Sequence, residues 1–350
     1  MQEANLYQKL KNKTVRCQVC QRNCLISEGK VGFCLSRLNQ GGRLFTLLYG
    51  VIAGGIQIDP IEKKPFYHFK PGSLVASVGS FGCNFRCKQC LNWWSSWGEP
   101  GTKQLNFLAS NYHQFKKIKP ENIIKTIIKS GYLGIAFTYN EPVIWVEFAH
   151  DLARLAKKAG LYTVFVTNGS WTQRTIDYLA PFIDAANIDF KGFSEKTYQK
   201  QAAYFGQVPE MAVYAQKKGI FLEITSLIIP GVNDNPEELK KMADWIVKNL
   251  GPDTPWHFSQ FDPQAAPDKK FQKIPFTRIK DLEKASEIGR SAGLKHVYIW
   301  APDSSYSQSD TFCPKCKNFV IKRAGWQPEK IDIDFPGNCR FCGYKLKIIL

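Results

Sequence analysis

The stretch GSFGCNFRCKQCLNWW (residues 79–94) places three cysteines, Cys83, Cys87 and Cys90, within eight residues, and no fourth cysteine lies close to them. A tetrahedral metal site needs four ligands, so this trio is one thiolate short. A cubane iron–sulfur cluster held by three protein thiolates keeps one iron open for a substrate or cofactor. A zinc ion that borrows a distant histidine is the alternative.

Outward from this stretch, short apolar runs alternate with amphipathic segments. Val, Ile and Phe dominate the short runs, which predict β-strands at residues 74–80, 133–139, 162–168, 185–190, 221–229, 255–261 and 296–300. Apolar residues at i, i+3 and i+4 predict helices within residues 140–160, 172–182, 235–251 and 276–293. The cysteine trio follows the first predicted strand directly.

Strands separated by helices need crossover connections, so the sequence predicts an α/β fold with a parallel sheet. Six or seven strand–helix units are too few for a closed eight-unit barrel and favour an open or partial one of the TIM type. We expect three parts: an N-terminal Cys-rich lobe with its connector (1–72), the barrel (73–301) and a C-terminal metal-binding lobe (302–350). Chemistry in such folds lies at the carboxyl ends of the strands, where the trio is expected.

The C-terminal lobe carries two CxxC pairs separated by 22 residues, formed by Cys313, Cys316, Cys339 and Cys342. Two such pairs close a tetrahedral site without an open position, which predicts a structural zinc ribbon. A rubredoxin-type iron site is the main alternative.

The N-terminal lobe carries four more cysteines, Cys17, Cys20, Cys24 and Cys34, in the pattern CxxC, three residues, C, nine residues, C. Four thiolates can close a metal site here as well, and the spacing is compatible with zinc or with an iron–sulfur cluster. Zinc is slightly favoured, and unmetallated thiols are a third interpretation.

Composition sets broader limits on the 350-residue chain. All eleven cysteines fall in these three groups, and about 220 residues between the second and third contain none, which favours metal binding in a reducing compartment over disulfides. No signal-like or membrane-length apolar segment occurs, so we expect a cytoplasmic protein without a membrane partner. The formal net charge of +17 is reduced if the thiolates bind metals, and indicates a solvated lysine surface more than a nucleic-acid site.

The CxxxCxxC spacing resembles that of the radical S-adenosylmethionine (SAM) superfamily, in which SAM occupies the open iron of a [4Fe–4S] cluster. The resemblance extends along nearly the whole chain and is strongest to the radical SAM enzyme of the AmmeMemoRadiSam system, which is similar to pyruvate formate-lyase activating enzymes. It rests on the segments GCNFRCKQCLNW, TYNEP, VTNG, NIDFKGFSEKTY, LIIPGVND, PWHFSQFDP and CPKCKNFVIKRAGW. That family has an incomplete (βα)6 barrel.

The resemblance implies roles for residues at the strand ends. Cys83, Cys87 and Cys90 would hold the cluster, and the residues that would contact SAM are Asn140, Glu141, Thr167, Asn168, Asp189, Lys191 and His257. Two positions depart from the family pattern: Gln89 stands where an aromatic residue is usual, and Val166 where activating enzymes tend to have an acid. Taken alone, His257 is also compatible with an ordinary core histidine.

The function implied is reductive cleavage of SAM to methionine and a 5′-deoxyadenosyl radical, which abstracts hydrogen from a substrate. No side chain is required as a general acid or base. The resemblance implies a flavodoxin- or ferredoxin-type electron donor, a glycine of a partner protein as substrate, and AMMECR-family and Memo-family associates. Radical modification of RNA or a small molecule, and a non-catalytic metal-bearing binding module, are the alternatives.

Overall fold

The computed structural model describes residues 1–97, 112–300 and 308–350. Its centre is an eight-stranded sheet in the order β14-β13-β12-β11-β10-β9-β8-β7. Strands β8 to β14 run parallel and β7 is antiparallel at the edge. The strands are β7 (Gln57–Pro60), β8 (Leu74–Val78), β9 (Gly134–Phe137), β10 (Tyr162–Thr167), β11 (Ala185–Asp189), β12 (Phe221–Ile228), β13 (Trp256–Gln260) and β14 (Val297–Trp300). All seven predicted strands are therefore confirmed.

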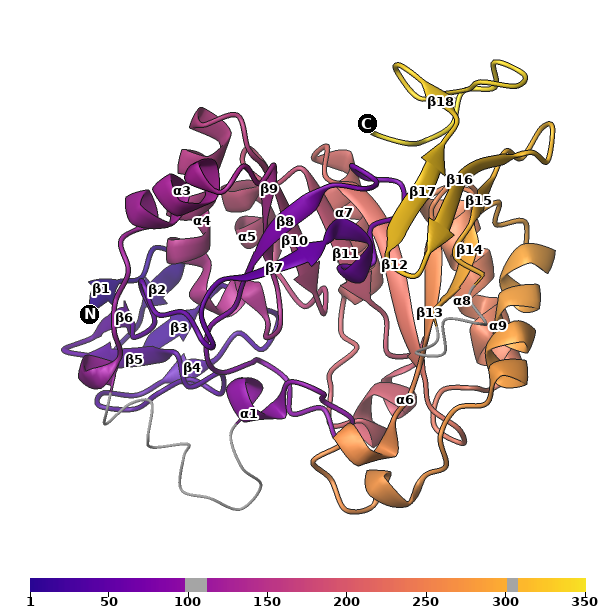
Figure 1. Ribbon diagram of the computed structural model, residues 1–350. Helices are drawn as coiled ribbons and strands as arrows, with labels where there is room; N and C mark the ends of the chain where they lie inside the picture. The colour runs from indigo at the N-terminus through magenta and orange to yellow at the C-terminus, as the bar shows by residue number, and fades with distance from the viewer. Residues whose placement is uncertain (98–111, 301–307) are drawn as a thin grey trace.

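The parallel strands follow one another in sequence order, so every crossover connection leads to the next strand along the sheet. Right-handed crossovers of this kind place their helices on one face, as Figure 1 shows. The connecting helices are α3 (Pro120–Lys129), α4 (Val146–Lys158), α5 (Gln173–Leu179), α6 (Glu195–Lys200), α7 (Val208–Lys217), α8 (Pro236–Asn249) and α9 (Ile279–Ser291). Short helical turns are η1 (Ile61–Lys63), α1 (Trp93–Ser96), η2 (Tyr112–Gln114), η3 (Pro142–Trp145), η4 (Pro263–Ala265) and η5 (Phe271–Lys273).

The helix starts follow local capping chemistry. Asn235 caps α8 by accepting a hydrogen bond from the Glu238 amide, with Pro236 at the first helical position, and Thr172 caps α5 in the same way. The predicted helices at residues 140–160, 172–182, 235–251 and 276–293 are confirmed as α4, α5, α8 and α9. Sequence reasoning missed α3, α6 and α7, which have ten, six and ten residues.

The two faces of the sheet differ in chemistry. The helix-covered face carries the largest apolar core, to which β12 contributes Leu222 and Ile224. The opposite face carries a smaller apolar cluster and several buried polar groups, including Glu223 of the same strand. This alternation along β12 is the two-residue period of a strand, so one strand supplies both the core and a polar inner face.

The inner face is covered by residues 61–72, which comprise η1 and the chain that leads from it toward β8, and which are called the inner segment here. The buried Glu223 carboxylate accepts hydrogen bonds from the backbone amides of Tyr67 (3.0 Å), His68 (2.9 Å) and Phe69 (3.2 Å). Asn187 Nδ2 of β11 donates to Pro65 O at 2.7 Å. The inner segment is thus bonded to two strands of the parallel sheet.

The N-terminal lobe consists of two small antiparallel sheets, β1-β6-β5 and β2-β3-β4. Its strands are β1 (Gln2–Glu3), β2 (Tyr7–Lys9), β3 (Val15–Cys17), β4 (Leu25–Ile26), β5 (Arg37–Gln40) and β6 (Arg43–Thr46). A bidentate ion pair docks it on α4: Arg37 Nη1 and Nη2 lie 2.7 and 2.9 Å from the Glu147 carboxylate oxygens, and both side chains are 1% exposed.

The C-terminal lobe contains the strands β15 (Thr311–Phe312), β16 (Phe319–Ala324), β17 (Gln327–Ile331), β18 (Ile333–Asp334) and β19 (Asn338–Cys339). It has a small core of its own. Buried Arg323 connects it to the inner segment by donating to Tyr67 O at 2.7 Å. The predicted boundary with the sheet falls at residues 301–307, outside the described residues.

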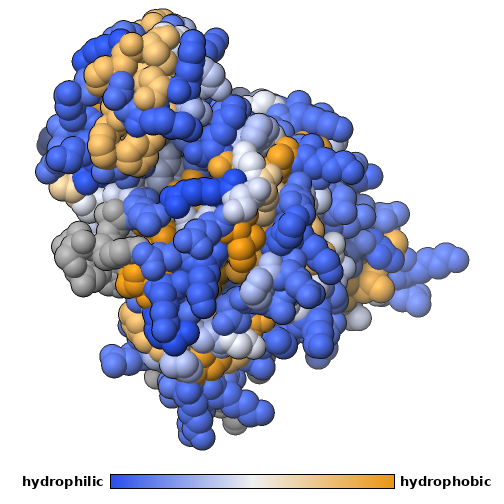
Figure 2. Space-filling view, turned by 90° about the vertical axis from the view of Figure 1, so that its right-hand side faces the viewer, coloured by the Kyte–Doolittle hydropathy of each residue, from blue (hydrophilic) through white to orange (hydrophobic). Residues whose placement is uncertain are grey.

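The surface is largely hydrophilic in the view of Figure 2. Figure 2 shows hydrophilic side chains over most of the face that it presents, with the C-terminal lobe projecting at the top. In the described part of the chain, no helix combines the length and the apolar character needed to cross a bilayer.

Replacement of Glu223 by glutamine tests how strongly the inner segment depends on this carboxylate. Glu223→Gln leaves at least one of the buried amides without an acceptor, so we expect the free energy of unfolding to fall by about 2–4 kcal/mol. The exposed Glu237→Gln is the matched control and should change stability little. Thermal unfolding of both variants measures the difference. Equal melting temperatures would show that the inner segment does not depend on the Glu223 carboxylate.

Candidate cluster and cofactor site

A cavity of about 290 Å³ opens at the carboxyl ends of β9 to β12, a size near the lower end for small-molecule pockets. Its lining includes all three cysteines of the trio. It also includes six of the seven residues expected to contact a cofactor: Asn140, Glu141, Thr167, Asn168, Asp189 and Lys191. The fold therefore brings together residues that are up to 108 positions apart in the sequence.

The trio loop is tied to the end of β9 by amide side chains. Asn140 Oδ1 accepts from the Ser80 amide (3.1 Å), and its Nδ2 donates to Gly82 O (2.9 Å). Asn92, beyond the third cysteine, donates to Tyr139 O at 2.9 Å. Asn140 thus lines the cavity and also fixes the backbone that presents the first cysteine.

Burial controls the ionisation of the trio. It raises the pKa of Cys83 and of Cys87 to about 12 and that of Cys90 to about 11. Without a bound cation these thiols stay neutral at physiological pH, whereas metal ligation would stabilise the thiolates. The trio has the chemistry of ligands more than that of free nucleophiles.

Glu141 is a buried carboxylate whose three hydrogen-bond donors are all neutral. Thr167 Oγ1 (2.7 Å) and the amides of Asn168 (2.7 Å) and Val143 (3.3 Å) donate to it. Burial raises the pKa of Glu141 to about 7, although hydrogen bonds from Asn168 and Thr167 oppose the rise. A carboxylate held in this way gains most from a cationic partner.

Asp189 and Lys191 form an ion pair on the other side of the cavity, with Asp189 Oδ2 2.6 Å from Lys191 Nζ. Burial opposes the charge of Lys191, but Asp189 and Cys87 raise its pKa above the ordinary value. The second oxygen of Asp189, Oδ1, is buried without a partner, as are Thr225 Oγ1 and Gln89 Oε1, and all three residues line the cavity. A polar ligand would satisfy these atoms.

His257 lies outside the lining of this cavity. Its Nε2 is 2.7 Å from Glu223 Oε2, and its ring contacts Tyr67 and Tyr298 beneath the inner segment. Sequence reasoning missed Glu223, because a single acid within an apolar strand carries no motif. It also missed Asn84 of the trio loop, whose Oδ1 accepts from Asn168 Nδ2 at 2.7 Å.

The N-terminal lobe touches the trio loop at Gly82. This glycine has φ +80°, and a Cβ atom there would overlap the backbone carbonyl oxygen of Cys34. Only glycine combines that backbone conformation with such a close approach. Cys34 of the N-terminal lobe is therefore in direct contact with the loop of the trio.

The C-terminal cysteines are arranged as a compact four-sulfur group. All four Sγ atoms lie within 4.8 Å of one another, with Cys313–Cys342 and Cys316–Cys339 each at 3.7 Å. Metal–sulfur bonds of about 2.3 Å in a tetrahedron place the sulfurs about 3.8 Å apart, so this group has the dimensions of a single-ion site. Among the residues described, no other set of three or more cysteine, histidine or acidic side chains is so close.

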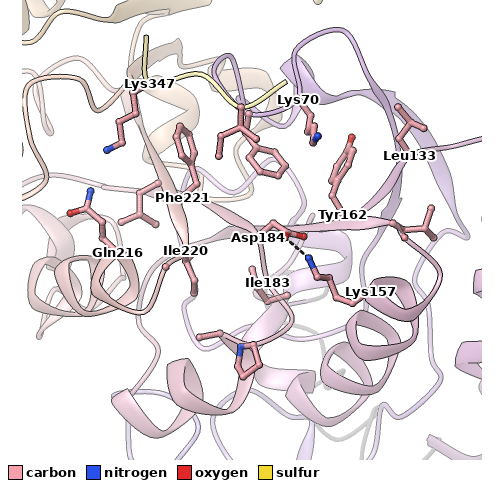
Figure 3. A pocket seen from close by; sticks show the side chains of 18 residues that line it. Lys70, Leu133, Lys157, Tyr162, Ile183, Asp184, Gln216, Ile220, Phe221 and Lys347 are labelled. Carbon is pink, nitrogen blue, oxygen red and sulfur yellow. Dashed lines mark hydrogen bonds and ion pairs between the residues drawn. The ribbon is translucent and has the colours of Figure 1, made fainter. Parts of the chain in front are cut away.

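A larger cavity of about 860 Å³ lies at the opposite end of the strands, where Tyr162 begins β10 and Phe221 begins β12. Figure 3 shows Lys157 and Asp184, which line this cavity, pointing toward one another, and their side chains form an ion pair at 2.5 Å. No cysteine lines this cavity. The smaller cavity beside the trio is therefore the better candidate for chemistry.

Comparison with known proteins identifies the family. The profile described as "Radical SAM superfamily" matches residues 77–246, which include the trio and all residues that line the cavity except Ser259. The uncharacterized protein MJ0808 of Methanocaldococcus jannaschii is 36% identical over the full length of both chains. The chain belongs to the radical SAM superfamily.

Activating enzymes are among the relatives of this radical SAM protein. The putative glycyl-radical enzyme activating enzyme MJ1227 of Methanocaldococcus jannaschii is 22% identical, over 63% of this chain and 86% of that protein. The pyruvate formate-lyase-activating enzyme of Clostridium pasteurianum is 23% identical, over 48% of this chain and 67% of that protein. A radical SAM methyltransferase structure from Sphaerobacter thermophilus shares 15% identity over 66% of this chain and 67% of that chain, with a TM-score of 0.48.

The superfamily implies a [4Fe–4S] cluster and SAM, and the residues of the cavity fit both groups. Three partly exposed cysteines line one side, and their sulfurs do not converge as closely as those of the C-terminal set do. A cubane separates its cysteine sulfurs by roughly 6 Å because iron and sulfide lie between them. The unpartnered oxygens of Asp189, Thr225 and Gln89 supply acceptors for a polar cofactor.

Alanine at Gly82 tests the contact between the N-terminal lobe and the trio loop. Gly55 has the same φ of +80° but nothing within 4 Å of the added Cβ, so it is the matched control. We expect Gly55→Ala to cost about 1–2 kcal/mol through its backbone conformation alone. Gly82→Ala should lower the melting temperature further and reduce the iron retained after anaerobic reconstitution. Equal losses in the two variants would exclude the contact with Cys34.

Proposed function

We propose that this protein is an activating-enzyme-like radical SAM enzyme in which Cys83, Cys87 and Cys90 hold a [4Fe–4S] cluster. The observation that carries the proposal is the cavity that these partly exposed cysteines share with two acids, the buried Glu141 and the partly exposed Asp189. When bound and reduced, the cluster supplies the electron that cleaves SAM to methionine and a 5′-deoxyadenosyl radical, which then removes a hydrogen atom from the substrate. The residues of the chain bind, orient and desolvate the reactants.

Glu141 is proposed to accept hydrogen bonds from the ammonium group of SAM. Its present donors are neutral, so a cation would compensate the buried charge that raises its pKa. Thr167 and Asn168 hold the Glu141 carboxylate and would lie beside the rest of the cofactor. Asp189 Oδ1 has no partner and is proposed to accept from a hydroxyl group of the ligand.

Lys191 is proposed to balance charge at this site. Its ammonium group is buried beside Asp189, and Cys87 contributes to the rise of its pKa. A cluster with three thiolates and one open iron carries net negative charge, so a buried cation nearby stabilises its reduced, more negative state. His257 is assigned no contact with SAM, since it pairs with Glu223 outside the cavity lining.

The proposed hydrogen donor is a glycine of a partner protein, by analogy with the relatives described as activating enzymes. An open, partial barrel would admit a polypeptide loop, which a closed one would exclude. Motif resemblance further supports a place in the AmmeMemoRadiSam system, with AMMECR-family and Memo-family associates and a flavodoxin- or ferredoxin-type donor. The C-terminal four-sulfur group is proposed as a structural zinc ribbon, because its spacing suits one ion.

Product analysis tests the proposed reaction. Protein reconstituted anaerobically with iron and sulfide, then given SAM and a strong reductant, should form 5′-deoxyadenosine well above the level of a Cys87→Ala control. Chromatography with mass detection quantifies the product. Absence of product from protein with a full cluster complement, also in the presence of candidate partner proteins, would leave the non-catalytic binding module as the better description.

Glutamine at Glu141 tests the proposed ammonium contact. Loss of a charge-assisted hydrogen bond worth about 1.5–3 kcal/mol should weaken SAM binding about 10- to 100-fold. The exposed Glu210→Gln is the control and should bind SAM normally. Equilibrium dialysis with labelled SAM measures both affinities, and melting temperatures check that the variants are folded. A folded Glu141→Gln protein with unchanged affinity would remove Glu141 from the SAM site.

A further inference from the structure

The four N-terminal cysteines line a cavity of their own beneath the trio loop. Cys17, Cys20 and Cys34 are buried and Cys24 is partly exposed, and all four face the same space. Arg37 and Asn84 also line it. The arrangement brings four potential thiolate ligands around one point inside the protein.

The spacing of these sulfurs differs from that of the C-terminal group. Within the described residues, only the C-terminal set has three or more ligand atoms within 4.8 Å of one another, so no three of the N-terminal sulfurs are that close. A single ion with bonds of about 2.3 Å would need sulfurs about 3.8 Å apart. Sulfurs that share a cavity at wider spacing suit a larger inorganic group, and a cubane needs roughly 6 Å between them.

Two buried hydrogen-bond donors at this cavity have no partner. Arg37 Nε is free although its other guanidinium nitrogens bind Glu147, and Asn84 Nδ2 is free although its Oδ1 accepts from Asn168. Buried donors without acceptors are costly. A group with four thiolates carries about two negative charges and would accept from both, which favours a metal-bound state over free thiols.

The cavity adjoins the candidate active site. Asn84 follows Cys83 in the trio loop, and its Oδ1 lies 3.7 Å from Cys83 Sγ. The Cys34 backbone packs against Gly82, which precedes Cys83. One short loop therefore separates the two sets of cysteines, and a redox group in the N-terminal cavity would lie next to the cluster of the trio.

We propose that Cys17, Cys20, Cys24 and Cys34 bind a second [4Fe–4S] cluster, and that this cluster relays electrons to the cluster held by the trio. In each relay step a one-electron protein donor, such as a reduced flavodoxin, reduces the second cluster. That electron then passes to the trio's cluster, which restores the second cluster, and no atoms are exchanged. The metal assignment stands on the cavity itself, whereas the relay rests on the proposed function.

Metal content of a variant without the trio tests the assignment. Protein in which Cys83, Cys87 and Cys90 are all replaced by alanine, reconstituted anaerobically, should retain about four irons and one zinc per chain, against about eight and one in the wild type. Its reduced form should show a [4Fe–4S] EPR signal that added SAM does not change. About two zincs and no iron in this variant would overturn the proposal.

The converse variant tests the relay. Cys24→Ala alters the most exposed of the four ligands and should lose about four irons while keeping the trio's cluster. With reduced flavodoxin as donor, reduction of the remaining cluster, followed by EPR on rapidly frozen samples, should be at least about tenfold slower than in the wild type. Unchanged rates would exclude the relay.

Two further comparisons keep the outcomes separate. Cys316→Ala should lose zinc and no iron, which controls for general effects of cysteine removal. If the variant without the trio keeps four irons but the wild type forms no 5′-deoxyadenosine, the second cluster stands and the proposed function fails. If that variant binds no iron but the wild type cleaves SAM, the proposed function stands and the second cluster fails.

Discussion

The buried carboxylate of Glu223 is the interaction on which the arrangement of this molecule depends. It accepts three backbone amides of the inner segment and pairs with His257, all on the face of the sheet opposite the helices. An acid without exposure to solvent is costly unless its oxygens are satisfied, so strand β12 and the inner segment stabilise each other. Arg323 extends the same polar network to the C-terminal lobe by binding Tyr67 O.

The inner segment also reaches the candidate site. Asp59 and Lys64 flank η1, and their side chains form a buried ion pair at 2.7 Å. The Tyr139 hydroxyl donates to Asp59 at 3.0 Å, and Tyr139 has a φ of +71°, unusual for a residue other than glycine. Directly after this residue the chain places Asn140 and Glu141 at the cavity. The unusual backbone conformation of Tyr139 is thus held in part by the contact between its hydroxyl group and Asp59.

Much of the fold could be predicted because parallel strands buried on both faces appear as apolar runs, and their order along the chain equals their order in the sheet. The cavity residues could be predicted because they follow those strands directly, as Glu141 and Asp189 do. His257 looked equivalent to them from its position on a strand, yet it pairs with Glu223. The sequence indicates that a residue lies on the inner face of the sheet, but not how far it lies from the cavity. That distance decides whether the side chain can contact a cofactor or instead forms a structural pair.

The sequence by itself determined the class of chemistry. The CxxxCxxC spacing, the alternation of strands and helices and the C-terminal CxxC pairs are local patterns, so they can be recognised without knowing how distant segments pack. Only the tertiary structure decided how far apart the sulfurs of each group lie, because those distances depend on segments brought together by packing. The C-terminal sulfurs converge to 3.7 Å, while the N-terminal ones surround a cavity against Asn84 and Gly82 of the trio loop. The sequence shows which residues can be metal ligands. The distances between their sulfur atoms depend on long-range contacts such as the one between Cys34 and Gly82.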